Sequence, residues 1–174
     1  MPAGPADLDP NQEPRQSAGL RRVRGAGRAL PIRERIRGPW RVAVSERSME
    51  PGILPGDWLL VDPTVERWPR RGSIVVFREP DGDLLAIKRV AARPGDRVRL
   101  DSGFLVLGDD EAWLLSDAPA AELLEQGGGA PVDSRRYGPV TIDCLVGRAW
   151  FRYGPVGRVG RLTGRSTSGG RPSP

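Results

Sequence analysis

Tight turns rich in proline, glycine and aspartate interrupt this chain at short intervals, and they constrain its fold more than any other feature. The sequence holds 23 glycines and 18 prolines in 174 residues. Three such turns, Pro55-Gly56-Asp57, residues 80–83 and Pro94-Gly95-Asp96, separate short apolar runs. Short apolar runs between turn residues are typical of β-strands, so the chain favours short strands over long helices.

The apolar runs predict a mainly β fold with mostly antiparallel sheets. Strands are expected over residues 40–44, 58–62, 74–78, 84–91, 98–100, 104–107, 113–115 and 145–153. The Pro-Asp-Gly-Asp turn at 80–83 is a hairpin signal, so the strands on either side of it should pair antiparallel. Residues 120–126 predict one helical turn. Many short strands at regular spacing indicate a partly closed β assembly.

Composition divides the chain into a folded domain over 38–155 and two extensions. Residues 15–37 hold eight arginines and one acid, Glu34, and residues 1–37 are predicted to be a disordered arm. Anionic lipid and nucleic acid are alternative partners for this arm. Because no aromatic residues interleave with its arginines, no nucleic-acid binding is expected, and weak contact with a membrane surface is the partner retained. Residues 156–174 are predicted to be a disordered Gly/Arg/Ser tail.

The chain lacks the residues that several kinds of site require. Cys144 is the only cysteine and there is no histidine, which excludes an intrachain disulfide and a cysteine-histidine zinc site. We therefore expect no metal and no cofactor. No apolar run approaches the roughly 20 residues of a membrane-spanning helix, and no secretory signal is visible. The sequence predicts a cytoplasmic protein, peripheral to the membrane at most.

Lys88 is the only side chain that could act as a nitrogen base. The sequence has 27 lysines plus arginines and a single lysine, which leaves 26 arginines. An arginine cannot lose its proton in a protein, whereas a lysine can when its pKa is lowered. Ser48, at a bend 40 residues upstream, is the nucleophile that such a base would activate. We predict a serine-lysine pair.

Strand periodicity places Lys88 in an apolar layer. Leu84, Ala86 and Val90 share its face of the predicted strand, since side chains alternate between the two faces. Burial there would lower the lysine pKa toward neutral pH. The plainer structural alternatives are a serine that only shapes a turn and a lysine that only faces solvent.

Four segments in order resemble the boxes of the type I signal peptidase family. They are Ser48-Met49-Glu50-Pro51 with Leu54-Pro55-Gly56-Asp57; residues 71–77; Ile87-Lys88-Arg89-Val90 with Pro94-Gly95-Asp96-Arg97-Val98; and Asp133-Ser134-Arg135 with Tyr137-Gly138-Pro139-Val140 and Val146-Gly147-Arg148. The resemblance covers residues 40–155. It implies a β fold like those of signal peptidases and the LexA group of proteins.

The resemblance also implies roles for particular residues. Ser48 would attack a peptide carbonyl, Lys88 would accept the serine proton, and the Ser48 backbone N–H would stabilise the oxyanion. Met49, Ala86 and Ile87 would line a cleft that holds an extended substrate. Asp133 and Arg135 would form a supporting ion pair, with a purely structural salt bridge as the equal alternative.

The sequence departs from the family pattern at the site. Glu46 stands where bacterial members often have a serine that completes the oxyanion hole, and Pro131 stands where a serine often holds the lysine. Ser134 and Ser116 are the candidates to replace that lysine-holding serine. The family's Gly-Asp-Asn segment is changed to Leu115-Ser116-Asp117-Ala118, and an extra stretch runs to Gly129.

We predict a serine endopeptidase that removes an N-terminal leader or propeptide from a protein precursor. The missing anchor makes the chain similar to the proteases that mature nickel-type superoxide dismutase, which suggests that precursor as substrate. One alternative is a self-cleaving regulator of the LexA or UmuD type, with Ala26-Gly27 as the bond cut. The other alternative is an inactive member that binds peptides, which Glu46 and Pro131 would favour.

Overall fold

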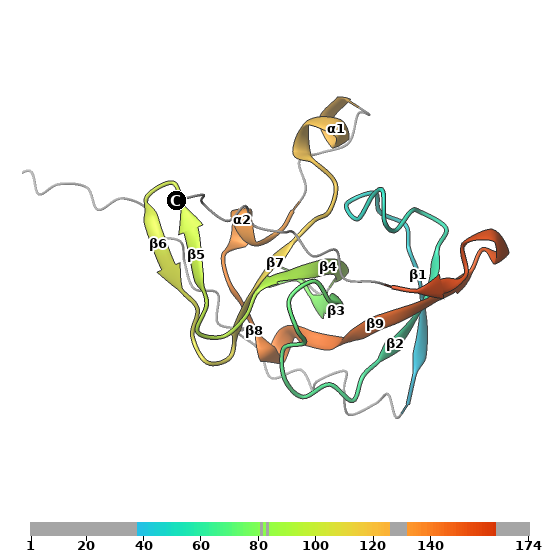
Figure 1. Cartoon of the computed structure of the whole chain (residues 1–174), viewed down its shortest axis with the longest axis horizontal. Helices are drawn as coiled ribbons and strands as arrows, with labels where there is room; N and C mark the ends of the chain where they lie inside the picture. Colours follow the sequence, from blue (N-terminus) through green and yellow to red (C-terminus); the bar gives the residue numbers. More distant parts are fainter. Residues whose placement is uncertain (1–37, 81, 83, 126–131, 163–174) are drawn as a thin grey trace, which may run out of the picture.

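The computed structural model describes residues 38–80, 82, 84–125 and 132–162, and strands dominate them (Figure 1). The strands are β1 (Trp40–Ala43), β2 (Trp58–Asp62), β3 (Ile74–Arg78), β4 (Leu85–Ala92), β5 (Arg97–Leu100), β6 (Gly103–Val106), β7 (Glu111–Leu115), β8 (Val140–Thr141), β9 (Leu145–Gly154) and β10 (Gly160–Arg161). The α-helices are α1 (Ala120–Glu125) and α2 (Ser134–Tyr137), and two 3₁₀ turns cover Ile142–Cys144 and Val156–Arg158.

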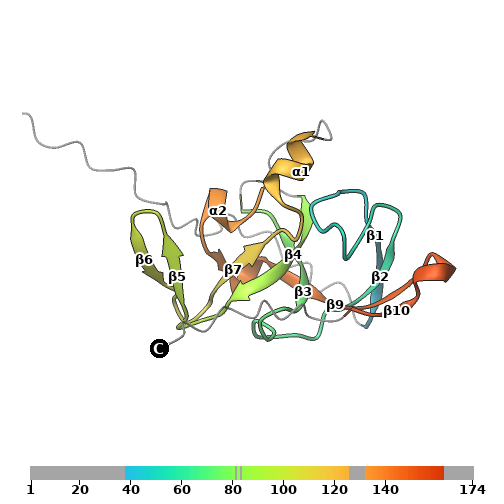
Figure 2. The same cartoon turned by 45° about the horizontal axis from the view of Figure 1, so that its top comes forward.

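Eight of the strands form one antiparallel sheet. Its order is β1-β2-β9-β3-β4-β7-β8, with β10 paired to β9, and every pairing is antiparallel. Strands β5 and β6 form a separate hairpin, which stands apart from the main sheet in both views (Figures 1 and 2). The predicted mainly β, antiparallel fold is confirmed, and so is the pairing of the two strands that flank residues 80–83.

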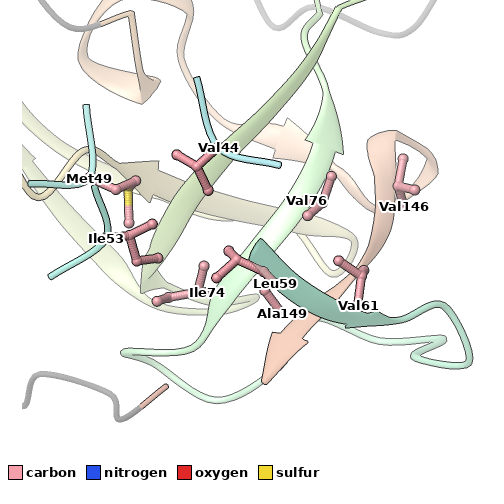
Figure 3. Close-up of a cluster of buried hydrophobic side chains, with 9 residues drawn as sticks. All are labelled: Val44, Met49, Ile53, Leu59, Val61, Ile74, Val76, Val146 and Ala149. Carbon is pink, nitrogen blue, oxygen red and sulfur yellow. The ribbon is translucent and has the colours of Figure 1, made fainter. Parts of the chain in front are cut away.

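Strand β3 lies at the centre of the sheet because both of its faces are apolar. Ile74 and Val76 pack into one buried cluster, and Val75 and Phe77 pack into another. The first cluster also holds Met49 and further residues from the serine turn and its neighbouring strands, as Figure 3 shows: Val44, Ile53, Leu59, Val61, Val146 and Ala149. One of the buried clusters is therefore built around the segment that carries Ser48.

Several boundaries differ from the predicted ones. Strand β4 begins at Leu85, and Leu84 is 72% exposed. The prediction that Leu84 shares a buried face with Lys88 is therefore wrong. The helical turn at α1 is present. The short helix α2 was not predicted; it begins after Asp133, whose carboxylate caps it by accepting from Arg135 N.

Residues 156–162 correct the predicted disordered tail, because they continue the fold. The 3₁₀ turn Val156–Arg158 is followed by β10, which pairs with β9. The rest of that tail, residues 163–174, and the arginine-rich arm at 1–37 lie outside the described residues, so the predictions for them stay predictions.

Gly147 lets β9 cross close to the chain at the end of β2. A Cβ atom at this position would lie 2.6 Å from the backbone oxygen of Asp62 and 2.6 Å from Val61 Cγ1. Because the backbone oxygen cannot turn aside as a flexible side chain would, the two strands would have to separate.

We expect Gly147→Ala to lower the free energy of unfolding by roughly 1–3 kcal/mol, the usual cost of overfilling a packed site. Urea denaturation followed by circular dichroism measures the change. Gly157→Ala is the matched control, since a Cβ there meets nothing within 4 Å. Equal stability of the two variants would contradict the close approach.

Candidate active site

Ser48 and Lys88 meet in the structure, although 40 residues separate them in sequence. Ser48 lies in a turn that is closed by the bonds from Glu50 N to Arg47 O, 3.0 Å, and from Ile53 N to Met49 O, 2.9 Å. Lys88 lies on β4 and points toward this turn, where its Nζ donates to Ser48 Oγ at 2.7 Å. A hydroxyl in direct contact with a basic nitrogen is the arrangement that nucleophilic catalysis by serine requires.

Lys88 is buried, with 5% of its surface exposed. Burial lowers the pKa of its ammonium, because the charged form loses its hydration. The negative charges of Asp133, Glu79, Glu46 and Asp117 oppose that change without cancelling it, so the pKa stays below its ordinary value. The amine can therefore become neutral at a lower pH than an exposed lysine. The predicted burial of Lys88 is confirmed.

The segment that follows β7 binds the backbone of Ser48. Its carbonyl oxygen accepts from Asp117 N at 3.0 Å and from Ala118 N at 3.1 Å. Asp117 is itself fixed by Arg89, whose Nε donates to Asp117 Oδ1 at 2.7 Å and whose Nη2 pairs with Asp117 Oδ2. Arg89 follows Lys88 directly, so one strand carries both the lysine and the residue that anchors the serine turn.

Asp133 is a buried carboxylate whose oxygens are fully engaged. They accept from Arg135 Nη2 at 2.7 Å, from Arg135 Nε at 3.0 Å, from Arg135 N at 3.1 Å and from Ser116 N at 3.0 Å. Burial by itself would raise the pKa of Asp133, but these hydrogen bonds to the ionised form outweigh it and lower the pKa. The predicted Asp133–Arg135 ion pair is present.

The two serines proposed to replace a lysine-holding serine differ in their contacts. Ser134 is fully buried and its Oγ accepts from Leu114 N at 2.9 Å, so it ties α2 to β7. The Ser116 hydroxyl is also buried, but it has no hydrogen-bond partner among the described residues. Pro131, which occupies the usual position of the lysine-holding serine, lies outside the described residues.

The remaining predicted site residues surround the pair at different depths. Met49 is 1% exposed and packs in the core, whereas Ala86 and Ile87 are half-buried beside Lys88. A role for these three in binding substrate stays a prediction. Glu46 is exposed, and its charge reaches Lys88.

The sequence analysis did not predict a cluster of ion pairs that also supports the serine turn. Asp57 is fully buried; Arg152 Nη1 lies 3.0 Å from its Oδ2 and Arg158 Nη1 lies 3.1 Å from its Oδ1. Asp57 also accepts from Leu54 N at 2.9 Å, and Arg152 donates to Gly52 O at 2.9 Å. The aspartate of a Pro-Gly-Asp turn could have indicated a residue that caps the turn. Nothing in the local sequence indicates that its partners are arginines distant in the chain.

The described residues offer neither a metal site nor a membrane span. No three His, Cys, Asp or Glu side chains within 38–80, 84–125 and 132–162 gather as metal ligands would. No helix in these ranges has the length and apolar character needed to cross a bilayer.

Comparison with known proteins identifies the family of this chain. The family model for signal peptidase, peptidase S26, matches residues 27–120. The chain belongs to this family. Membership indicates a serine-type peptidase, as the sequence predicted. The matched residues include Ser48, Lys88 and Asp117 but end before Asp133.

Three relatives show how far the likeness extends. "Probable signal peptidase I-2" of Synechocystis sp. is 33% identical over 69% of this chain, and the match spans 65% of that protein's length. "Signal peptidase I" of Leptolyngbya laminosa is 27% identical over 92% of this chain and 91% of its own length. "Mitochondrial ATP-independent inner membrane protease subunit 1a" of Arabidopsis thaliana is 32% identical over 66% of this chain and 70% of its own length.

Removing the charge of Asp133 should lower the pKa of Lys88 further, because that carboxylate stabilises the ammonium. We expect Asp133→Asn to show this in a ¹³C-lysine NMR titration, in which the single lysine gives an unambiguous signal. Asp96→Asn is the control, since Asp96 pairs with Arg71 and is not among the acids whose charges raise the pKa of Lys88. An unchanged titration in Asp133→Asn would show that Asp133 does not act on the lysine.

Proposed function

We propose that this chain is a serine endopeptidase that removes an N-terminal leader from a protein precursor, with Ser48 as nucleophile and Lys88 as general base. The observation that carries the proposal is the 2.7 Å contact between Lys88 Nζ and Ser48 Oγ, made by a lysine that is 5% exposed. The names of the relatives, which include signal peptidases from Synechocystis sp. and Leptolyngbya laminosa, support leader removal as the activity.

The contact supports an ordinary two-stage hydrolysis. The neutral Lys88 amine takes the Ser48 hydroxyl proton while Ser48 Oγ bonds to the substrate carbonyl carbon. The ammonium then gives this proton to the leaving amine as the peptide C–N bond breaks, which leaves an acyl-enzyme. Water attacks the acyl carbon and loses a proton to Lys88; the ester bond breaks, and the proton returns to Ser48.

The oxyanion of each stage needs hydrogen-bond donors. The Ser48 backbone N–H is one candidate, because it makes no hydrogen bond within the described part of the chain. The exposed Glu46 carboxylate supplies an acceptor rather than a donor, so the second donor must come from another group or from the substrate itself.

Open strand edges beside the pair suit an extended substrate. Strand β4 pairs with β3 from Leu85 to Arg89, but its other edge pairs with β7 only from Arg89 onward. Strand β1, which leads toward Ser48, is at the end of the sheet. A substrate strand can add to such edges through backbone hydrogen bonds. Ala86 and Ile87 would then contact its side chains.

The precursor of nickel-type superoxide dismutase is the substrate that we propose to test first. Its support is the resemblance of the sequence to the proteases that mature it. The test mixes wild type and Ser48→Ala with that precursor and, separately, with a general signal-peptide substrate, and reads products by mass spectrometry. Cleavage by wild type alone supports the proposal, and the substrate that is cut decides the class. A folded wild type that cuts neither would favour the inactive peptide-binding alternative.

Lys88→Arg should lower kcat/KM by about 10²- to 10⁴-fold, the usual contribution of a general base. The positive charge remains, but an arginine cannot accept the serine proton at working pH. Arg99→Lys, on the exposed side of β5, is the control for a lysine–arginine exchange. Turnover by Lys88→Arg at the wild-type rate would refute the mechanism.

The cleavage rate should rise with pH and then level off. Only the neutral amine accepts a proton, and burial moves the pKa of Lys88 below its ordinary value of 10.5, so the rising limb should lie below that pH. Initial rates between pH 6 and 10, with the fold checked at each pH, measure the profile. A flat profile over this range would count against a titrating base.

A further inference from the structure

We propose that a pocket beside the serine turn binds a small organic acid through its carboxylate, and we call it the turn pocket. Residues 51–53 of the serine turn line it, together with residues from β3, β4, β9, β10 and the segment after β7. Its volume is about 280 Å³, which suits a ligand smaller than a drug-sized molecule. Neither Ser48 nor Lys88 lines the turn pocket, so the proposal concerns binding at a second site and does not depend on the function proposed above.

Three arginines from different strands line the turn pocket. Arg89 comes from β4, Arg152 from β9 and Arg161 from β10, while Asp117 is the only acid among the lining residues. Arg89 is occupied, because its Nε and Nη2 bind the Asp117 carboxylate and its Nη1 donates to Gly72 O at 2.6 Å. This ion pair leaves the other two arginines as the groups that can bind a ligand.

Arg152 and Arg161 keep hydrogen-bond donors for such a ligand. Arg152 donates through Nη1 to Gly52 O at 2.9 Å and to Asp57 Oδ2 at 3.0 Å, and through Nε to Arg158 O, but its Nη2 has no partner among the described residues. Arg161 makes no hydrogen bond or ion pair within the same residues. A guanidinium carries five N–H donors, so both side chains have capacity to spare.

The charges around the turn pocket favour an anion. The buried Asp57 carboxylate lies 3.0 Å from Arg152 and 3.1 Å from Arg158, so one acid is shared between two arginines. With the pair of Arg89 and Asp117 and the unpaired Arg161, four arginines gather around two aspartates, which leaves two positive charges uncompensated. An anionic group placed beside Arg152 and Arg161 would compensate them through charge-assisted hydrogen bonds.

The rest of the lining is apolar, and this selects a carboxylate over a phosphate. Ile53 and Ile74 belong to the same buried cluster, shown in Figure 3, and the half-buried Leu162 packs against it. Phosphate has oxygens in every direction, so some would face hydrocarbon without a donor. A carboxylate on a short aliphatic group is polar at one end only, and its planar oxygens match the fork of a guanidinium.

A ligand in the turn pocket would contact the backbone that carries Ser48. Arg152 donates to Gly52 O, and the N–H of the next residue, Ile53, closes the serine turn by donating to Met49 O at 2.9 Å. On the opposite side of the lining, Asp117 N donates to Ser48 O at 3.0 Å. The same turn therefore bears the candidate nucleophile and one wall of the carboxylate site.

The test titrates the full ¹⁵N-labelled chain with isovalerate and follows backbone amides by NMR. Saturable shifts are expected at Gly52, Ile53 and Leu162, with a Kd of about 1 mM, as befits a ligand of so few atoms. Isovaleramide has nearly the same shape without the charge and should not bind. Inorganic phosphate, which the apolar lining opposes, should bind more weakly than isovalerate.

Arg161→Gln should weaken isovalerate binding by about tenfold, because it removes a charged donor at an exposed position. Arg99→Gln, on the exposed side of β5 and outside the pocket lining, makes the same charge change and should leave the affinity unaltered. The amide spectrum of each variant reports whether it is folded. Should Arg161→Gln fail to fold, the comparison of isovalerate with isovaleramide on wild type still decides the proposal.

Four results would overturn the proposal: no saturable shift, equal binding of isovaleramide, preferred binding of phosphate, or shifts centred on Ile87 and Lys88 instead of the turn pocket. N-acetyl-leucine distinguishes the sources of the carboxylate, since it presents a carboxylate and an aliphatic side chain as the end of a peptide does. Tighter binding of N-acetyl-leucine than of isovalerate supports a peptide end as the ligand, and the reverse supports a free acid. None of these measurements requires turnover, so failure of the proposed function would leave them unaffected.

Discussion

A buried lysine with no carboxylate partner among the described residues is the constraint on which this site depends. Lys88 lies in the sheet with 5% of its surface exposed, and its Nζ contacts a hydroxyl rather than an acid. Burying an unpaired ammonium costs several kcal/mol, so a lysine in this place favours its neutral form. The surroundings must therefore hold the side chain in position without a strong ion pair that would keep it protonated.

Three of the acids around the serine turn are paired with arginines. Asp133 is bound by Arg135, Asp117 by Arg89, and Asp57 by Arg152 and Arg158. Each pair also fixes backbone around the serine turn: Asp133 accepts from Ser116 N, Asp117 donates its N–H to the Ser48 carbonyl, and Asp57 accepts from Leu54 N. The acids thus shape the turn, and the charges of Asp133 and Asp117 still favour the ammonium form of Lys88.

Local sequence was sufficient for the parts of the structure that local chemistry determines. Turn residues and apolar alternation predicted β2 and β3 with their observed bounds, and alternation placed Lys88 on a buried face. Prediction from local sequence failed where contacts between residues distant in the chain determine the structure. Leu84 looked like a core residue but lies just outside β4 at 72% exposure, and residues 156–162 looked like a tail because the Arg158–Asp57 pair and the β9–β10 pairing are invisible in sequence. The link between Asp117 and Ser48 was missed for the same reason.

This arrangement offers a physical explanation for the near-absence of lysine. Arginine keeps its charge at any working pH and offers planar, two-pronged contacts, so it suits the structural pairs at Asp117 and Asp133. A lysine in place of Arg89 or Arg135 would bind the carboxylate less firmly. It would also be a second group able to release its proton. With permanent charges confined to arginines, Lys88 is the one basic side chain in the site whose charge can change. Within the described residues its nitrogen contacts an uncharged group, the Ser48 hydroxyl, at 2.7 Å.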